Sequence, residues 1–278
     1  MYQGKKVAVI IPAAGSGTRM GLPVPKQFMN IDGETMVAKT TRVFACNKFI
    51  DVVIILFPPK FMEKTEMKKS ENPANAEWNG IVRDKASREK AQKEKLPEVH
   101  GIKQAIYGTQ RAHIKAAILS GIGEIRDNLK FLVKQAGKKC IVITGDSSRS
   151  GSVRNGLMAL PDDISIVLVH DAARPYVDDG MINDVIAAAD MHGAAVPAVP
   201  LKDSLRTVDG GVDRDDYFLV QTPQGFRREV LVAAYNEAEK TGEKASDDAS
   251  LVDRIGQRVF MVSGSYRNIK ITTVEDLE

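Results

Sequence analysis

The sequence has few cysteines, few histidines and few aromatic residues, and the first two shortages limit the kinds of site that we expect. Its 278 residues include two cysteines, four histidines and one tryptophan, and aromatic residues make up 6%. Cys46 and Cys140 lie in or beside apolar segments without metal-ligand spacing, so we expect them to be reduced core residues of a cytoplasmic protein. The histidines form no cluster in the sequence, which argues against a histidine-based metal site.

Long apolar runs are absent as well. No run approaches the roughly 18–20 residues that a bilayer-spanning helix requires, so we expect no membrane partner. The chain enters an apolar strand within its first ten residues, which predicts that it has no signal peptide. A hydrophobic content of 43% and a charged content of 27% are ordinary for a soluble globular protein.

Short runs rich in Val and Ile alternate with amphipathic segments. The runs predict strands at 7–13, 52–57, 141–144, 165–170, 194–200 and 259–263. Helical spacing of apolar residues predicts helices at 36–46, 153–160, 181–191 and 230–239. This alternation indicates an α/β fold with a mainly parallel sheet and helices on both faces, in which ligands bind at the carboxyl ends of strands.

Residues 60–139 interrupt this alternation of strands and helices, and their charge differs from that of the rest of the chain. They contain 18 Lys/Arg against 10 Asp/Glu, whereas the rest of the chain has 21 against 26. We interpret 1–59 and 140–278 as the main domain and 60–139 as an inserted basic helical subdomain. The insertion could be a solvated helical surface, bind a partner or nucleic acid, or gate access to a site. Its mixed charges and few aromatic residues make nucleic acid the weaker alternative.

The first motif follows the first predicted strand and contains small residues followed by two cations. Small residues after a buried strand let backbone N–H groups approach a phosphate chain, and Arg19 and Lys26 add positive charge to the same place. The sequence GKS or GKT is absent, so the motif is not a P-loop, and the third glycine of a dinucleotide fingerprint is also missing. The predicted phosphate cradle consists of Pro12, Ala13, Ala14, Gly15, Ser16 and Gly17.

With an Arg and a Pro-Lys at these offsets, the chain resembles the sugar-phosphate nucleotidyltransferases and, more narrowly, the 2-C-methyl-D-erythritol 4-phosphate cytidylyltransferase family. The resemblance implies a Rossmann-like fold, a homodimer, and Mg²⁺-dependent attack of a polyol phosphate on the α-phosphorus of CTP. Methylerythritol 4-phosphate is the leading acceptor, and ribitol 5-phosphate is the alternative from a sister branch. Arg19, Lys26 and Lys270 would be catalytic, with both lysines on the α-phosphate.

Two further motifs of the family follow predicted strands. In the segment VHDAARP, Asp171 would hold the metal, Ala172 would contact the nucleotide and Arg174 would face the acceptor. An Asp in this position is often only a turn former. In the serine-rich segment 145–154, the resemblance makes Ser152 the base-contacting residue, and Asp146 stands where the family usually has a second glycine. A helix-capping loop would explain the same serines.

The remaining motifs concern the acceptor. In the family, the segment corresponding to 200–216 is an arm that crosses a homodimer and carries an arginine, here Arg214, to the partner's site. A charged hairpin is otherwise usually just solvated, and the SDDAS segment at 246–250 could equally be the N-cap of a helix at 251–255. The resemblance assigns five residues to acceptor binding: Arg174, Ser204, Arg214, Thr222 and Ser246.

Overall fold

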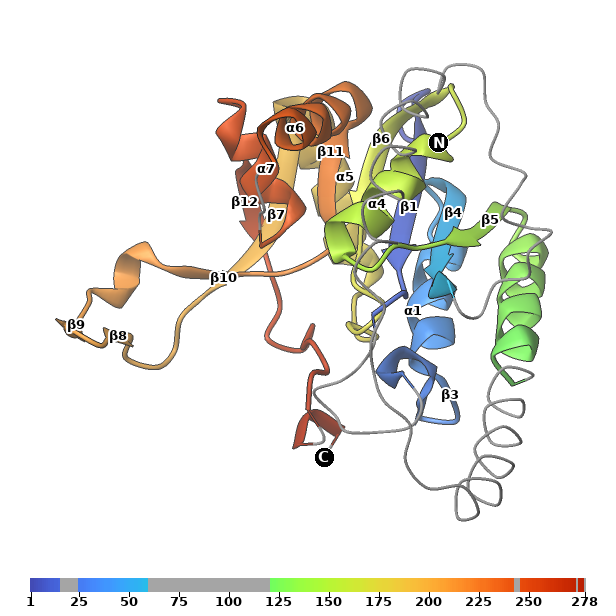
Figure 1. Cartoon of the computed structure of the whole chain (residues 1–278), viewed down its shortest axis with the longest axis horizontal. Helices are drawn as coiled ribbons and strands as arrows, with labels where there is room; N and C mark the ends of the chain where they lie inside the picture. Colours follow the sequence, from blue (N-terminus) through green and yellow to red (C-terminus); the bar gives the residue numbers. More distant parts are fainter. Residues whose placement is uncertain (16–24, 60–120, 243–245, 274, 278) are drawn as a thin grey trace, which may run out of the picture.

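The computed structural model describes residues 1–15, 25–59, 121–242, 246–273 and 275–277, and within these ranges the central sheet has eight strands (Figure 1). Its order is β10-β7-β11-β6-β1-β4-β5, with β12 beside β7. The strands are β1 Lys6–Pro12, β4 Ile50–Phe57, β5 Lys139–Thr144, β6 Ile164–Val169, β7 Ala194–Pro200, β10 Phe218–Val220, β11 Gln224–Arg227 and β12 Phe260–Ser263. Strands β5, β4, β1 and β6 are parallel, and β10 and β11 pair antiparallel with their neighbours. The predicted α/β fold with a mainly parallel sheet is confirmed.

Helices cover both faces of this sheet. Along β1, Val7, Val9 and Ile11 belong to one hydrophobic cluster, whereas Ala8 and Ile10 belong to the other. Because successive side chains of a strand point to opposite faces, this division places one cluster on each side of the sheet. The helices are α1 Met36–Cys46 and α5 Asp179–His192 on the first side, and α4 Arg149–Met158, α6 Arg228–Thr241 and α7 Asp248–Arg254 on the second.

The segment before β5 also contributes to the core. Residues 121–135 are helical, and Ile122, Leu129 and Val133 are buried in the same cluster as α1. Residues 60–120 lie outside the described ranges, so the division of the chain into 1–59 with 140–278 and an inserted 60–139 remains a prediction. The proposed roles of that insertion in binding or gating lie outside them too.

The prediction that both cysteines are core residues is only partly right. Both cysteines are free, as expected, but Cys46 is exposed because it is the last residue of α1, and Cys140 in β5 is half-buried. Burial raises the pKa of the Cys140 thiol to about 11, so it stays protonated at neutral pH. Among the described residues, no helix is long and apolar enough to cross a bilayer.

Two small pairs of strands lie beside the main sheet. Strands β2 Asn30–Ile31 and β3 Glu34–Thr35 lead into α1, and the side chain of Thr35 caps that helix by accepting from the Ala38 amide. Strands β8 Arg206–Thr207 and β9 Gly210–Gly211, followed by the 3₁₀ turn η7 Arg214–Asp216, form an arm that extends away from the body (Figure 1). We call residues 201–217 the arm.

The topology fixes where a ligand site should lie. The chain passes from β1 to β4 and β5 on one side and then returns to β6 on the other side of β1. Strand order therefore reverses between β1 and β6, and such a switch point opens a crevice outside the carboxyl ends of the strands. The motif loops that follow β1, β5 and β6 all lie at this edge.

Candidate active site

A cavity of about 170 Å³ lies where the loops after β1, β5 and β6 meet. It is lined by Pro12, Ala13, Ala14, Gly15, Lys26, Gln27, Asp146, Ser147, Ser148, Arg149, Ser152, Asp171, Ala172, Ala173 and Lys270. A larger cavity of about 650 Å³ lies between α1 and the 121–135 helix, but its wall combines aliphatic side chains with the Arg42–Glu34 ion pair. The smaller cavity has the chemistry of an anion site, so we take it as the candidate site.

Small residues are required where two of these loops approach each other. A Cβ on Gly145 would lie 2.4 Å from the Ala14 Cβ and 2.9 Å from the Ser152 Oγ. The loop after β1 is held by the buried side chain of Gln27, whose Nε2 donates to the carbonyls of Ala13 and Gly15 at 2.6 and 2.9 Å. These contacts fix the described part of the predicted phosphate cradle against the start of α4.

Helix α4 begins earlier than predicted and turns its amino end toward the cavity. The predicted start was residue 153, but Ser148 caps the helix by accepting from the Gly151 amide at 2.9 Å, so Arg149 is the first helical residue. The buried Ser152 hydroxyl accepts from the Asp146 amide at 2.8 Å and lies 2.8 Å from the Ser148 carbonyl. Ser152 therefore shapes the loop that lines the cavity as well as forming part of its wall.

The two predicted catalytic lysines converge from opposite ends of the chain. Lys26 begins the 3₁₀ turn η2 Lys26–Phe28, and its Nζ donates to the Ile271 carbonyl at 2.6 Å. Lys270, the residue before Ile271, is 40% exposed, and its Nζ lies 2.6 Å from Asp171 Oδ2. Both ammonium groups thus reach the same cavity wall.

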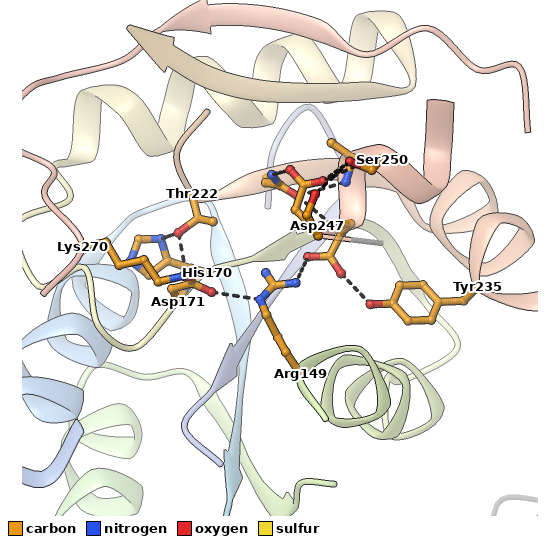
Figure 2. Close-up of polar contacts among 12 residues, drawn as sticks. Arg149, His170, Asp171, Thr222, Tyr235, Asp247, Ser250 and Lys270 are labelled. Atoms are coloured by element: carbon orange, nitrogen blue, oxygen red, sulfur yellow. Dashed lines mark hydrogen bonds and ion pairs between the residues drawn. The ribbon is translucent and has the colours of Figure 1, made fainter. Parts of the chain in front are cut away.

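Asp171 is the acidic centre of the cavity. Its Oδ1 accepts from the Arg149 Nε at 3.1 Å and its Oδ2 pairs with Lys270 (Figure 2). Burial alone would raise the pKa of Asp171, but Arg149 and then Lys270 outweigh that effect and hold the pKa well below its usual range. The carboxylate is therefore ionised at neutral pH and keeps two cations at the cavity.

Thr222 lies behind this carboxylate and does not line the cavity. Its buried hydroxyl accepts from the Asp171 amide at 3.1 Å and lies 3.1 Å from the Nδ1 of His170 (Figure 2). His170 is fully buried, and its Nε2 lies 3.1 Å from the Arg174 carbonyl. A carbonyl only accepts, so Nε2 carries the proton and Nδ1 accepts from Thr222. His170 is therefore a packed, hydrogen-bonded histidine.

We expect His170→Gln to make the protein more resistant to mild acid. Burial lowers the pKa of His170 from 6.5 to about 4. Between these values the unfolded chain binds a proton that the folded chain rejects, so stability falls as the pH drops from 6.5 toward 4. Protonation of this histidine in the unfolded chain should lower the free energy of unfolding by about 2 kcal/mol between pH 7.5 and pH 5. Urea unfolding at both pH values should show a smaller decrease in unfolding free energy for the variant than for the wild type. Equal decreases would contradict this prediction.

Arg174 also stays outside the cavity lining, although it lies close to the site. Its Nη1 donates to the Asn268 carbonyl at 2.7 Å, whereas its buried Nε has no hydrogen-bond partner among the described residues. Burial lowers the pKa of Arg174, and Asp171 only partly opposes this. A buried donor without a partner favours an anion or carbonyl from a ligand.

The other predicted residues divide into two groups. Ser16, Gly17 and Arg19 lie outside the described ranges. Ser204, Arg214 and Ser246 are exposed and do not line the cavity. Arg214 Nη1 donates to the Lys202 carbonyl within the arm, and the Ser246 Oγ lies 3.4 Å from the Ser250 Oγ.

Two residues of the ion-pair network around Asp171, Arg149 and Asp248, were not predicted from the sequence. Arg149 lies in the serine-rich segment 145–154 and was given no role there, although it pairs with both Asp171 and Asp248. Asp248 was part of a predicted cap segment, but Asp247 caps α7 by accepting from the Ser250 amide at 3.0 Å. Because Asp247 makes the cap, the carboxylate of Asp248 is available to Arg149. Two adjacent acids at one helix start are the signal that could have identified this second role.

Comparison with known proteins agrees with this geometry. The model of the 2-C-methyl-D-erythritol 4-phosphate cytidylyltransferase family matches residues 7–93 and 94–278. The enzyme of that name from Geobacillus thermodenitrificans is 33% identical over 273 residues, covering 96% of this chain and 92% of that protein. The one from Pelotomaculum thermopropionicum is 32% identical over 278 residues, covering 98% and 91%.

A solved structure extends the comparison to the fold. The crystal structure of the cytidylyltransferase from Thermus thermophilus has a TM-score of 0.62 and 27% sequence identity, covering 98% of this chain and 95% of that one. The break in the family match, between residues 93 and 94, falls inside the segment predicted to be inserted. The resemblance carried by the motifs is confirmed, and the chain belongs to the 2-C-methyl-D-erythritol 4-phosphate cytidylyltransferase family.

Proposed function

We propose that this chain transfers the cytidylyl group of CTP to 2-C-methyl-D-erythritol 4-phosphate and releases pyrophosphate. The observation that carries the proposal is the convergence of Lys26, Lys270 and Asp171 on one small-residue cavity at the switch point of the sheet, in a member of this family. A phosphate oxygen of the acceptor forms a bond to the α-phosphorus while the bond to the bridging oxygen of pyrophosphate breaks. No protein nucleophile is needed.

The site residues would act mainly through charge. Phosphoryl transfer builds up negative charge on phosphate oxygens, and fixed cations that meet this charge lower the barrier. We place Lys26 and Lys270 on the α-phosphate, and we place Arg19, which lies outside the described ranges, on the triphosphate. Backbone groups of residues 12–17 would hold the phosphates, and Asp146, Ser152 and Ala172 would contact the rest of the nucleotide. Arg174, with its unpartnered Nε, is our candidate for the acceptor phosphate.

The cavity also suits a divalent cation that is shared with substrate phosphates. Among the described residues, no group of three or more His, Cys, Asp and Glu side chains is arranged to hold a metal, so protein ligands alone do not form a cage there. Mg²⁺ commonly takes one or two carboxylates and completes its shell with phosphates and water. The ionised Asp171 keeps acceptor sites on each oxygen beyond those facing Arg149 and Lys270. We assign Asp171 as the ligand, and bound Mg²⁺ would neutralise charge on the triphosphate.

Pyrophosphate release by the purified protein tests this proposal. CTP, UTP and ATP should each be offered with Mg²⁺ and either methylerythritol 4-phosphate or ribitol 5-phosphate. We expect release only with CTP and methylerythritol 4-phosphate, and its loss in Lys26→Ala. Turnover with ribitol 5-phosphate alone would move the chain to the sister activity, and no turnover with any pair would overturn the proposal.

We further propose that two copies share their active sites through the arm. Strands β10 and β12 both pair with β7 and expose apolar side chains, including Phe218 at 42%, Leu219 at 51% and Met261 at 51%. Exposed apolar clusters of this kind mark interaction surfaces. The arm that follows β7 extends away from the body (Figure 1), and its residue Arg214 does not line the cavity of its own chain. A second copy would cover this surface. Its acceptor site would receive Arg214 and also Ser204 of the same arm.

Mixing two inactive variants should restore activity if the sites are shared. We expect Lys26→Ala and Arg214→Ala each to be inactive as homodimers. In a mixed dimer, one site combines an intact Lys26 with an intact Arg214 from the other copy. Random exchange at equal concentrations should therefore recover about a quarter of the wild-type activity. No recovery, in a mixture shown by mass spectrometry to contain mixed dimers, would contradict the shared site.

A further inference from the structure

A fully buried carboxylate, that of Asp248, lies outside the cavity lining, and the proposed reaction does not use it directly. The side chain of Asp248 is 1% exposed. Its backbone amide donates to the Gln224 Oε1 at 3.1 Å, which fixes the first turn of α7 against β11. The Tyr235 hydroxyl of α6 donates to the Asp248 Oδ1, and burial followed by Asp248 raises the pKa of Tyr235. Tyr235 therefore stays a protonated donor.

The other oxygen of Asp248 faces Arg149. Arg149 Nη1 lies 2.8 Å from Asp248 Oδ2, although Oδ2 has no hydrogen-bond partner among the described residues. The contact is thus an ion pair that depends on charge rather than on a directional hydrogen bond. A buried carboxylate is costly unless a cation compensates it, and removing one partner of such a pair leaves the other uncompensated. The charge of Asp248 is therefore tied to the position of Arg149.

Arg149 in turn connects this carboxylate to the reaction site. Its Nε donates to Asp171, which pairs through its other oxygen with Lys270. The series of contacts from Tyr235 through Arg149 to Asp171 and Lys270 can be followed in Figure 2. Charges alternate along it, with Asp248 and Asp171 each next to Arg149. Arg149 touches both acids at once, so its position cannot change without disturbing Asp171.

We propose that Asp248 is a positioning residue, whose buried charge holds Arg149 and thereby fixes the Asp171 carboxylate and the Lys270 ammonium group at the reacting phosphate. This inference rests on the proposed function. Helix capping does not account for the burial, because Asp247 already caps α7; Asp253 of the same helix is exposed. A displacement of about 1 Å in a catalytic group can cost on the order of 100-fold in rate.

The test is a substitution that removes the charge of the Asp248 side chain and keeps its shape. Asp248→Asn retains an oxygen for the Tyr235 hydroxyl but removes the ion pair with Arg149. We expect kcat for cytidylyl transfer to fall on the order of tenfold, with a change in the KM for CTP of less than about threefold. Asp253→Asn, on the same helix, is the matched control and should keep wild-type kcat. Wild-type kcat in a folded Asp248→Asn would overturn the proposal.

A double-mutant cycle separates positioning from a general loss of structure. If Asp248 acts through Arg149, then Asp248→Asn should change kcat by less than about twofold in an Arg149→Gln background. A tenfold loss in both backgrounds would overturn the proposal, because Asp248 would then act independently of Arg149. If Asp248→Asn fails to fold, Tyr235→Phe takes its place in the cycle, with an expected loss of about threefold. Absence of turnover in the wild type would instead reject the proposed function.

Discussion

Lys26→Met is expected to reduce kcat for cytidylyl transfer by on the order of 10² to 10³. The substitution keeps the aliphatic stem and removes the ammonium group that donates to the Ile271 carbonyl next to Lys270. Negative charge on the α-phosphate is greatest in the transition state, so a fixed cation there acts mainly on kcat. The measurement is pyrophosphate release across a range of CTP concentrations, which separates kcat from KM.

The control for this prediction is a lysine away from the cavity. Lys134 is exposed on the 121–135 helix and does not line the cavity, so Lys134→Met should keep wild-type kcat. Thermal unfolding of both variants should show that each remains folded. A Lys26→Met enzyme with more than about a tenth of the wild-type kcat would remove Lys26 from the group of residues that meet the developing charge.

Local sequence patterns were sufficient for the framework of the fold. The predicted helix at 36–46 and strand at 194–200 have the observed bounds of α1 and β7. The β-strands of the parallel part are runs of Val and Ile, which pack well on both sides of a covered sheet. Strand β11 was not predicted, because the segment Gln224–Arg227 contains no β-branched residue and pairs with β6 and β7 only in the folded chain.

Part of the candidate site could also be predicted from local sequence patterns. The loops after β1, β5 and β6 could be located because each follows a recognisable strand, and parallel strands bring their carboxyl ends to one edge. Which side chains turn into the cavity depends on tertiary packing. Thr222 points to His170 and the Asp171 amide, so it supports the site from behind. Arg149 and Asp248 are 99 positions apart in the sequence, and no local pattern connects them.

The second large effect is expected for Asp171→Asn, which should lower kcat by on the order of 10² to 10³ without raising the KM for CTP. Asparagine cannot compensate Arg149 and Lys270, so the cavity gains net positive charge and continues to attract the triphosphate. The two cations lose the carboxylate that holds them 3.1 and 2.6 Å away. If Asp171 also holds Mg²⁺, the Mg²⁺ concentration for half-maximal rate should rise at least about tenfold.

Stability provides an independent readout for the same variant. The pKa of Asp171 is lower in the folded chain than its ordinary value of 3.8, so its charge stabilises the fold at pH 7 and this stabilisation is lost as the pH falls below that value. The variant should therefore unfold more easily than the wild type at pH 7, and the gap should narrow in acid. Asp253→Asn should leave the rate and the Mg²⁺ requirement unchanged. A folded Asp171→Asn enzyme with a wild-type rate and Mg²⁺ requirement would mean that Asp171 organises the free site without taking part in the transfer.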